Sequence, residues 1–353
     1  MSSNDRMRAL RNWRLLLGMG FLLLARTAAS VAAGFPANAE ELLKTLAIED
    51  GSALAKAEIV SYDVEEPTEK SLAAGLAMYL EAPWERVTAL VEQGIMIADD
   101  PDLLAIGTIP PSADPEAFSG VVFTEEQAHE AERLLSVGPG SEFNLSDSEI
   151  AGFRELQTTL GSGAGEALRE GVAKQYRKLL RERFQAYRNA GLSGIASYAR
   201  EGGQAVDVGA ELRVFTQHSE ELARFFPELQ AALLKYPAAM PADAVSVFRW
   251  VNRKTEGRPT FTLTHRLLLR SGSGAAFVLR EYYVGHSYNC SQLTLGIAPF
   301  QSGSLVFYSH RVSTDQVAGL AGGLRHAIGR KQLRDTMLAR MERLRSALQG
   351  GRR

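Results

Sequence analysis

Histidine and tyrosine side chains that could bind a ligand or do chemistry gather in the last third of the chain. Four of the six histidines fall there, and three of these lie, together with several tyrosines, in or between stretches that alternate in hydrophobicity. Imidazole and phenol groups among apolar neighbours are typical of a hydrophobic pocket with a few polar anchors. The alternative is that each is a hydrogen-bonded core or edge residue. As candidate ligand-binding residues we take His265, Glu281, Tyr283, His286, Tyr288, Tyr308 and His310.

Acid–base chemistry is a second interpretation of the same residues. A buried carboxylate at Glu281 would act with His265 or His286 as acid and base. Tyr283 or Tyr308 would then orient the substrate. This interpretation requires His265 and Glu281 to point into one shared cavity. If Glu281 faces outward from its strand, the interpretation loses its basis.

Motifs of better-defined chemistry are absent from the sequence. No two histidines have the His-x-x-x-His or His-Glu-x-x-His spacing, and the single cysteine, Cys290, excludes a cysteine-rich metal site. The Gly161–Gly165 stretch lacks the Gly-Lys-Ser/Thr ending of a phosphate-binding loop. No serine lies in a Gly-x-Ser-x-Gly elbow. The sequence therefore predicts no metal and no cofactor.

The charge balance limits the partners of the chain. Its 353 residues carry a formal net charge of −2 at pH 7, so nucleic-acid binding has no electrostatic support. A basic helix expected over residues 166–190 would allow peripheral contact with the cell envelope. Glutamates are interleaved with its arginines and lysines, which favours a salt-bridged solvent face instead.

The elements that position the candidate residues are five expected strands. Only short breaks containing glycine separate them, and breaks of that length allow hairpins but no crossover helix. The strands therefore predict an antiparallel meander. Phe261, Leu263, His265, Leu267 and Leu269 share one face of the second strand, and a one-sided sheet needs a cover. The expected strands are residues 245–252, 259–270, 275–284, 288–298 and 304–312.

One long helix over residues 314–348 is expected to provide that cover. Apolar residues recur along it at steps of three or four, from Val317 and Leu324 through Met341 to Leu348. Glycines are costly in a helix, yet its first half contains four of them. They would let the helix approach the sheet closely or leave room for a ligand beside it. The four glycines are Gly319, Gly322, Gly323 and Gly329.

Residues between the first strands and the meander are expected to be mainly helical. Capping boxes and apolar periodicity predict helices over residues 124–137, 146–160, 166–190 and 219–236. Further strands are expected at residues 103–109, 120–123 and 210–215.

The first 39 residues have the features of an export signal. Four arginines precede an apolar run from Leu15 to Ala25, and Ala37-Asn38-Ala39 fits a cleavage site before Glu40. The sequence therefore predicts a periplasmic or secreted protein. An uncleaved segment acting as an N-terminal anchor is the alternative.

A resemblance to a known superfamily rests on residues 72–93 and 245–348. A strand ending in Glu81-Ala82-Pro83, followed by a helix carrying Trp84-Glu85-Arg86-Val87, is similar to the opening of START-like proteins, the helix-grip or SRPBCC superfamily. The order of elements, ending in a meander and a long helix, also resembles these proteins. The resemblance implies an α+β fold in which an antiparallel meander grips the C-terminal helix. It also implies one domain over residues 40–350, with a mainly helical insertion at about 94–244.

Three functions remain open at this point. The resemblance implies a cavity between the sheet and the last helix that binds an apolar small molecule or a lipid. Some START-like proteins are cyclases or hydrolases, which keeps the acid–base interpretation open. The third function is that of a structural cell-envelope protein with a filled core and no ligand.

Overall fold

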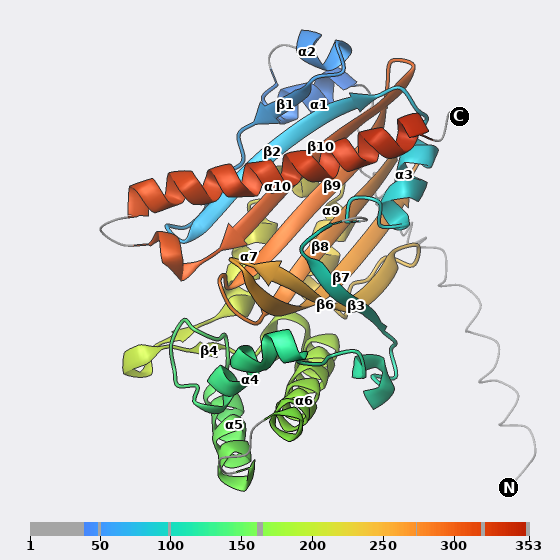
Figure 1. The fold of residues 1–353 in the computed structure, drawn as a ribbon. Helices are drawn as coiled ribbons and strands as arrows, with labels where there is room; N and C mark the ends of the chain where they lie inside the picture. Colours follow the sequence, from blue (N-terminus) through green and yellow to red (C-terminus); the bar gives the residue numbers. More distant parts are fainter. Residues whose placement is uncertain are drawn as a thin grey trace, which may run out of the picture. The chain divides into compact units, whose positions relative to one another are not determined.

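An eight-stranded antiparallel sheet forms the centre of the fold (Figure 1). The computed structural model describes residues 39–48, 51–97, 100–160, 165–272, 274–318 and 322–350, all within one compact unit. The strand order is β1-β2-β10-β9-β8-β7-β6-β3. The export signal expected over residues 1–39 lies outside the described residues except for Ala39.

The five expected strands of the meander are confirmed. Each pairs with the next, and β6 turns into β7 at Glu256-Gly257, where both residues have positive φ (53° and 77°). Glycine reaches such a φ without a steric penalty, which suits this position. The strands are β6 (Val245–Thr255), β7 (Arg258–Ser271), β8 (Gly274–Val284), β9 (Cys290–Phe300) and β10 (Gly303–Ser313).

Strands from the first third of the chain extend the meander at both edges. β2 (Ser71–Leu80) pairs with β10 from Leu80 opposite Ser304 to Ser71 opposite Ser313. β1 (Ile59–Tyr62) pairs with β2 and forms one edge of the sheet. β3 (Leu103–Ile109) pairs with β6 and forms the other edge. The sheet therefore joins residues that lie more than two hundred positions apart.

The long C-terminal helix α10 (Gly322–Gly350) crosses one face of this sheet in Figure 1. This α+β arrangement of an antiparallel sheet and a covering last helix is confirmed. The helix begins later than expected, because residues Asp315–Val317 form a 3₁₀ turn whose Thr314 side chain accepts a hydrogen bond from the Gln316 backbone. The short helix α3 (Trp84–Glu92) contributes to the same core.

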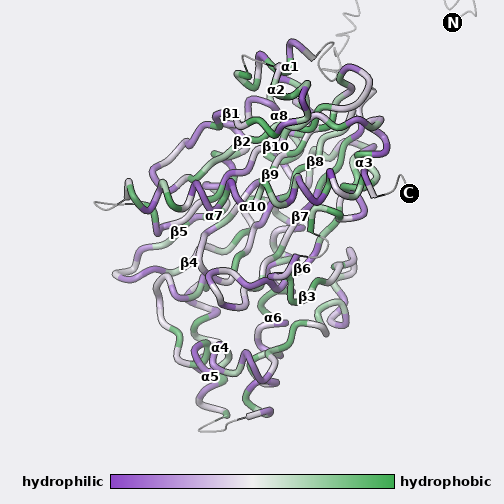
Figure 2. The backbone as a smooth tube through the Cα atoms, turned by 45° about the horizontal axis from the view of Figure 1, so that its top comes forward, coloured by the Kyte–Doolittle hydropathy of each residue, from purple (hydrophilic) through white to green (hydrophobic). Residues whose placement is uncertain are grey.

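The two halves of α10 differ in their contact with the sheet. Leu324 is 74% exposed and Ile328 is 50% exposed, so the expected apolar stripe fails in the first half. The second half packs on the sheet through Leu333, Met337, Met341, Leu344 and Leu348. Both hydrophilic and hydrophobic residues occur along the helix in Figure 2. Packing against the sheet therefore holds α10 mainly by its second half.

The opposite face of the sheet is also covered, which corrects the expectation of a one-sided sheet. On β8, Ala275 and Phe277 join the core beneath α10, whereas Ala276 and Val278 join a core on the other face. Apolar side chains on both faces of a strand require cover on both sides. The second cover consists of α1 (Ala39–Thr45), α7 (Val208–Gln217), α8 (Glu220–Phe225) and α9 (Pro227–Lys235).

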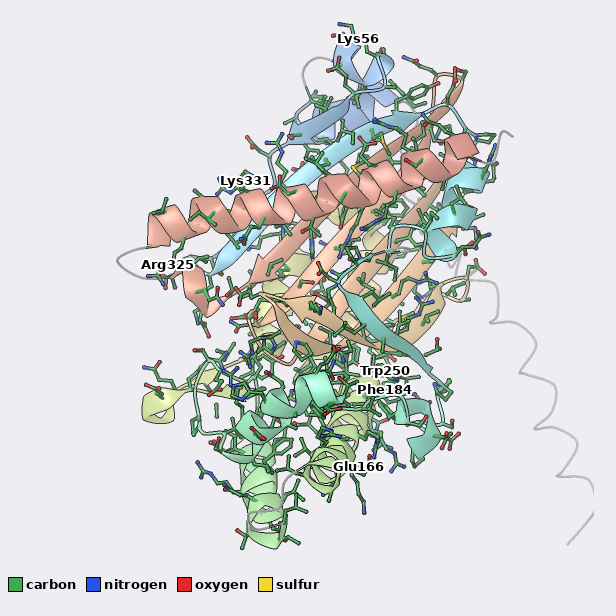
Figure 3. The ribbon with its side chains drawn as sticks, viewed as in Figure 1. Lys56, Glu166, Phe184, Trp250, Arg325 and Lys331 are labelled. Carbon is green, nitrogen blue, oxygen red and sulfur yellow. The ribbon has the colours of Figure 1, made fainter. Side chains whose placement is uncertain are left out.

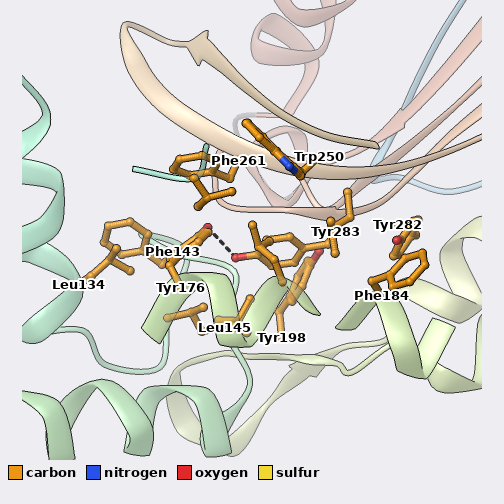
Figure 4. Packing of buried hydrophobic residues seen from close by; sticks show 14 of the residues in the cluster. Leu134, Phe143, Leu145, Tyr176, Phe184, Tyr198, Trp250, Phe261, Tyr282 and Tyr283 are labelled. Carbon is orange, nitrogen blue, oxygen red and sulfur yellow. Dashed lines mark hydrogen bonds between the residues drawn. The ribbon is translucent and has the colours of Figure 1, made fainter. Parts of the chain in front are cut away.

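Helices α4 (Ala128–Leu135), α5 (Asp147–Leu160) and α6 (Glu166–Ala190) form a third core with β6, β7 and β8. The register of β7 and β8 shifts at Leu263/Thr264, and as a result Tyr282 and Tyr283 both enter this core. The Tyr176 and Tyr283 hydroxyls lie 2.8 Å apart (Figure 4). The labelled Phe184 and Trp250 lie where the helices meet the sheet in Figure 3.

The remaining elements are short, and two expected strands are wrong. Residues 210–215 lie within the helix α7, and residues 120–123 form no strand. Among the described residues, no helix is long and apolar enough to span a membrane. The short elements are α2 (Ser52–Ala55), β4 (Tyr198–Ala199), β5 (Ala205–Val206), η1 (Pro115–Phe118), η2 (Glu125–Gln127), η3 (Gly191–Gly194), η4 (Glu201–Gly203) and η5 (Asp315–Val317).

Truncation on α10 tests whether its second half is the anchor. Leu344 is fully buried, so Leu344→Ala would leave a cavity in the core. The substitution should lower the free energy of unfolding by about 3 kcal/mol. Leu324→Ala on the exposed first half should change it by less than about 0.5 kcal/mol. Urea unfolding of the two variants measures both values. Equal losses at the two sites would contradict this account of α10.

Candidate functional site

A cavity of about 510 Å³ lies between the first half of α10 and the sheet. Side chains from β2, β6, β8, β9 and β10 line its sheet side, and α10 and the η5 turn line the other. Its apolar lining consists of Leu72, Leu279, Val312, Val317, Ile328 and Leu333. The polar side chains on which its chemistry depends are Arg253, Glu281, Tyr288, Ser291, His310 and Arg340.

Local packing explains why the cavity lies under the first half of the helix. From Leu333 onward, large side chains fill the space between α10 and the sheet. Gly329 lies four residues before Leu333 on the same side of the helix. A Cβ added there would lie 2.7 Å from Cδ1 of Leu72. The helix backbone therefore approaches β2 closely at this glycine, and Gly329 itself lines the cavity. Both consequences expected of the helix glycines, close approach and space for a ligand, meet at this position.

Glu281 on β8 is held by two hydroxyl groups of the cavity. Its Oε2 accepts hydrogen bonds from Tyr288 (2.8 Å) and Ser291 (2.5 Å). Burial raises the pKa of Tyr288 well above its usual value, and the Glu281 charge raises it further. Tyr288 therefore stays protonated and donates to the carboxylate. The Glu281 charge is stabilised within the protein by these two donors.

His310 and Arg340 form the second polar group of the cavity. Arg340 Nη1 donates a hydrogen bond to the Tyr308 hydroxyl (2.9 Å), and the Tyr308 and His310 rings lie parallel on the same face of β10. Burial lowers the pKa of His310 to about 3, and the charges of Arg340 and Arg253 contribute to the shift. His310 is therefore a neutral imidazole near pH 7, which donates a hydrogen bond from one ring nitrogen and accepts one at the other.

Two further arginines lie at the margin of the cavity. Arg253 on β6 forms an ion pair with Asp100, whose side chain is largely buried. Arg325 lies near the N-terminal end of α10 (Figure 3) and donates to the Gln316 carbonyl (3.0 Å). Arg253 already has a carboxylate partner, whereas Arg340 has none within ion-pair distance among the described residues.

The structure brings together some of the residues predicted from sequence and separates others. Glu281, Tyr288 and His310 line the cavity, and Tyr308 contacts it through its bond to Arg340. The other three candidates, His265, Tyr283 and His286, do not line it.

His265 lies on the face of the sheet that packs against the insertion. Its Nδ1 lies 3.0 Å from the Tyr187 hydroxyl, its Nε2 lies 2.9 Å from Ser246 Oγ, and its ring stacks on Phe248. In the register, His265 is opposite Arg280, whereas Glu281 is opposite Thr264 on the other face. The expectation that His265 and Glu281 share a cavity is therefore wrong. Alternation groups residues on a face but does not determine which helix covers that face.

Tyr283 and His286 belong to the contact between sheet and insertion. Tyr283 bonds Tyr176, as described above, while His286 Nε2 lies 2.8 Å from Thr260 Oγ1 and its Nδ1 lies 2.7 Å from Ser287 Oγ. Burial lowers the pKa of His286 to about 4, with the Arg258 charge adding to the shift. Although the Glu130 carboxylate lies 4.0 Å away, it already pairs with Arg258 and does not offset burial.

Arg340 is the important residue that sequence reasoning missed. A basic residue on the last helix is expected on its solvent face, yet Arg340 is only 8% exposed. Its position carries the signal: it lies three residues after Met337 and four before Leu344, both fully buried. That spacing places it on the buried stripe of the helix. The position of an arginine within an apolar stripe indicates a site more strongly than the presence of an arginine alone.

The described residues contain no group of three or more His, Cys, Asp or Glu side chains arranged to hold a metal ion. The lining of the cavity combines six apolar side chains with a larger number of polar and charged side chains. Comparison of the chain with protein-family models, with curated proteins and with solved structures finds no match in any of the three.

The buried neutral histidines predict loss of stability in acid. The unfolded chain takes up protons near the usual histidine pKa of 6.5, whereas His286 and His310 resist protonation to about 4 and about 3. Their contribution to stability is complete above 6.5 and is lost as the pH falls toward the lower values. Near pH 4.5 the loss should be about 2 kcal/mol for each histidine.

Denaturant unfolding at about pH 7.5 and 4.5 checks this prediction. The drop in the free energy of unfolding should be smaller by about 2 kcal/mol in His310→Asn than in the parent protein. The control is His129→Asn, because the His129 side chain is 81% exposed. It should keep the full drop. An unchanged drop in His310→Asn would show that folding does not lower the pKa of His310.

Proposed function

We propose that this protein binds an apolar small molecule or a lipid in the cavity between the sheet and α10, and carries it in the cell envelope. The observation that carries the proposal is the cavity of about 510 Å³, whose lining combines six apolar side chains with polar and charged ones. Ligand sites of small organic molecules have about 300–1,000 Å³ and combine an apolar lining with polar groups that fix the orientation of the ligand.

The START-like resemblance supports the same function. In those proteins the ligand cavity lies between an antiparallel meander and the C-terminal helix. Here the meander β6–β10 and helix α10 have that order, and β2 pairs with β10, the last strand of the meander. The insertion lies against the other face of the sheet, so it does not fill the space beneath α10. Both considerations favour a binding protein over a structural protein with a filled core.

The acid–base alternative has less support. It required His265, which faces the insertion, and His286, which is bonded to Thr260 and Ser287 and does not line the cavity. The remaining carboxylate, Glu281, is occupied by two hydroxyl donors. The cavity therefore has binding groups, whereas the acid–base pair on which catalysis would depend is separated by the sheet.

A cavity-filling substitution tests the binding proposal. Leu279 is half-buried in the cavity lining, so the larger side chain of Leu279→Trp should occupy the space and weaken uptake of the neutral fluorescent probe N-phenylnaphthylamine by at least about tenfold. Leu324→Trp adds the same group to an exposed position of α10 and should leave probe uptake unchanged. Absence of probe uptake by the parent protein, together with no lipid in organic extracts of protein purified from its own envelope, would refute the proposal.

The place of action is tested separately. If residues 1–39 direct export, the protein should appear in the periplasmic or secreted fraction with Glu40 as its first residue. Cell fractionation with N-terminal sequencing measures both properties. Replacing the four arginines of the first segment with glutamate should retain the protein in the cytoplasm. A cytoplasmic parent protein with an intact first segment would contradict export.

A further inference from the structure

Buried arginines mark the places where this fold encloses a positive charge. Among the described residues four arginines are less than a tenth exposed: Arg183, Arg280, Arg311 and Arg340. Burying a guanidinium costs free energy unless its donors find acceptors. The number of acceptors at each arginine therefore separates a structural arginine from one that awaits a partner.

Three of the four have several partners within the protein. Arg183 forms a two-bond ion pair with Glu149. Arg311 lies 3.5 Å from Glu221 and donates to a serine hydroxyl and two backbone carbonyls. Arg280 donates to two side-chain oxygens and a backbone carbonyl at 2.7–3.0 Å. These arginines are satisfied parts of the core.

Arg340 differs from the other three. Its Nη1 donates a hydrogen bond to the Tyr308 hydroxyl. Among the described residues no carboxylate lies within ion-pair distance of Arg340, and its buried Nε has no hydrogen-bond partner. In a guanidinium, the Nε–H and one Nη2–H point from the same edge and match the two oxygens of a carboxylate. The edge used for Tyr308 is a different one, so this fork remains available.

A second unpartnered atom lines the same cavity. His310 Nδ1 is buried and has no hydrogen-bond partner among the described residues, although His310 is only 8% exposed. Buried polar atoms without partners are uncommon and call for a physical reason. Two of them, on side chains from α10 and β10 that line one cavity, point to a polar group supplied from outside the chain.

The surrounding charges define the sign of that group. Glu281 is the carboxylate of the inner cavity, and two hydroxyl donors already stabilise it. Arg253 is paired with Asp100. Arg340 interacts with the charges of Glu281 and Asp100 but forms no ion pair with either, so an anionic group can still pair with its free edge. The apolar lining from Leu72 to Leu333 favours a hydrocarbon attached to it.

We propose that the ligand of this cavity is an amphipathic acid whose carboxylate or phosphate monoester is bound by Arg340 and His310. This inference rests on the proposed function and names the ligand class. The head accepts hydrogen bonds from the free edge of Arg340 and from the His310 imidazole in its Nδ1–H tautomer. The apolar part lies against the aliphatic lining and extends toward Ile328 on the exposed half of α10.

Four twelve-carbon ligands that differ only in their head test this proposal. Dodecanoate, dodecyl phosphate, dodecanol and dodecyltrimethylammonium are each titrated, below their micelle concentrations, against protein loaded with N-phenylnaphthylamine. At least one of the two acids should displace the probe about tenfold or more better than dodecanol, as one charge-assisted bidentate bond predicts. The quaternary ammonium should be the weakest competitor.

Variants of Arg340 locate the preference. Arg340→Gln should lose the preference for the acid over dodecanol. Arg340→Lys keeps the charge but lacks the planar fork, so it should retain only part of the preference. The control is Lys331→Gln on the outer side of α10, where the side chain is 76% exposed; it should behave as the parent. If Arg340→Gln fails to fold, His310→Asn provides the same comparison with a smaller loss.

The outcomes separate the two proposals. Probe uptake with equal displacement by dodecanoate and dodecanol would overturn the acid-binding inference and leave apolar binding intact. A preference for the acids that persists in folded Arg340→Gln and His310→Asn would also overturn it. Failure of the parent protein to take up the probe or any of the four ligands would refute apolar binding itself.

Discussion

Apolar side chains on both faces of β8, β9 and β10 are the constraint on which the rest of the fold depends. A strand of this kind has to be buried on both sides, and no single helix can do that. On one side, Phe277 and Leu295 lie beneath α10. On the other, Val278 and Phe307 lie beneath the helices of the first and middle parts of the chain. The insertion is therefore a required layer of the fold, which accounts for its length between two parts of one sheet.

This three-layer arrangement also decides where a cavity can form. The insertion side is filled by stacked aromatic rings such as Tyr187 on Tyr282, with centroids 4.0 Å apart. On the α10 side, apolar side chains of the helix fill the space only from Leu333 to Leu348. The first half of α10 and the η5 turn lie over the cavity. A helix that is anchored at one end leaves space at the other without unsatisfied backbone groups, since its hydrogen bonds are internal. The cavity is thus a consequence of how the apolar residues are distributed along α10.

Much of the fold could be predicted from the sequence, whereas the site could be predicted only in part. The meander followed from short glycine-containing breaks, and the last helix with its buried second half followed from the spacing of apolar residues, because both are local signals. Placing His265 beneath α10 was wrong, because alternation fixes which residues share a face but carries no information about the element that covers it. Leu268, which interrupts the apolar alternation of its strand, belongs to the α10 core and was the available sign of a second buried face. The shared placement of Tyr282 and Tyr283 depends on a register shift that no local pattern reveals.

Arg280 and Arg340 show how the same residue type serves two purposes in one sheet. Each guanidinium is enclosed by protein on opposite faces of the sheet, and neither forms an ion pair with a carboxylate among the described residues. The fold surrounds Arg280 with Thr216, Gln292 and the Leu233 carbonyl, so its cost of burial is met internally. Around Arg340 the fold supplies Tyr308 and leaves the Nε–H without an acceptor. Arg280 shows that this protein can provide a buried guanidinium with all its acceptors. Arg340, at the wall of the cavity, lacks an acceptor for its Nε–H, and a group that binds an acidic ligand requires such a free donor.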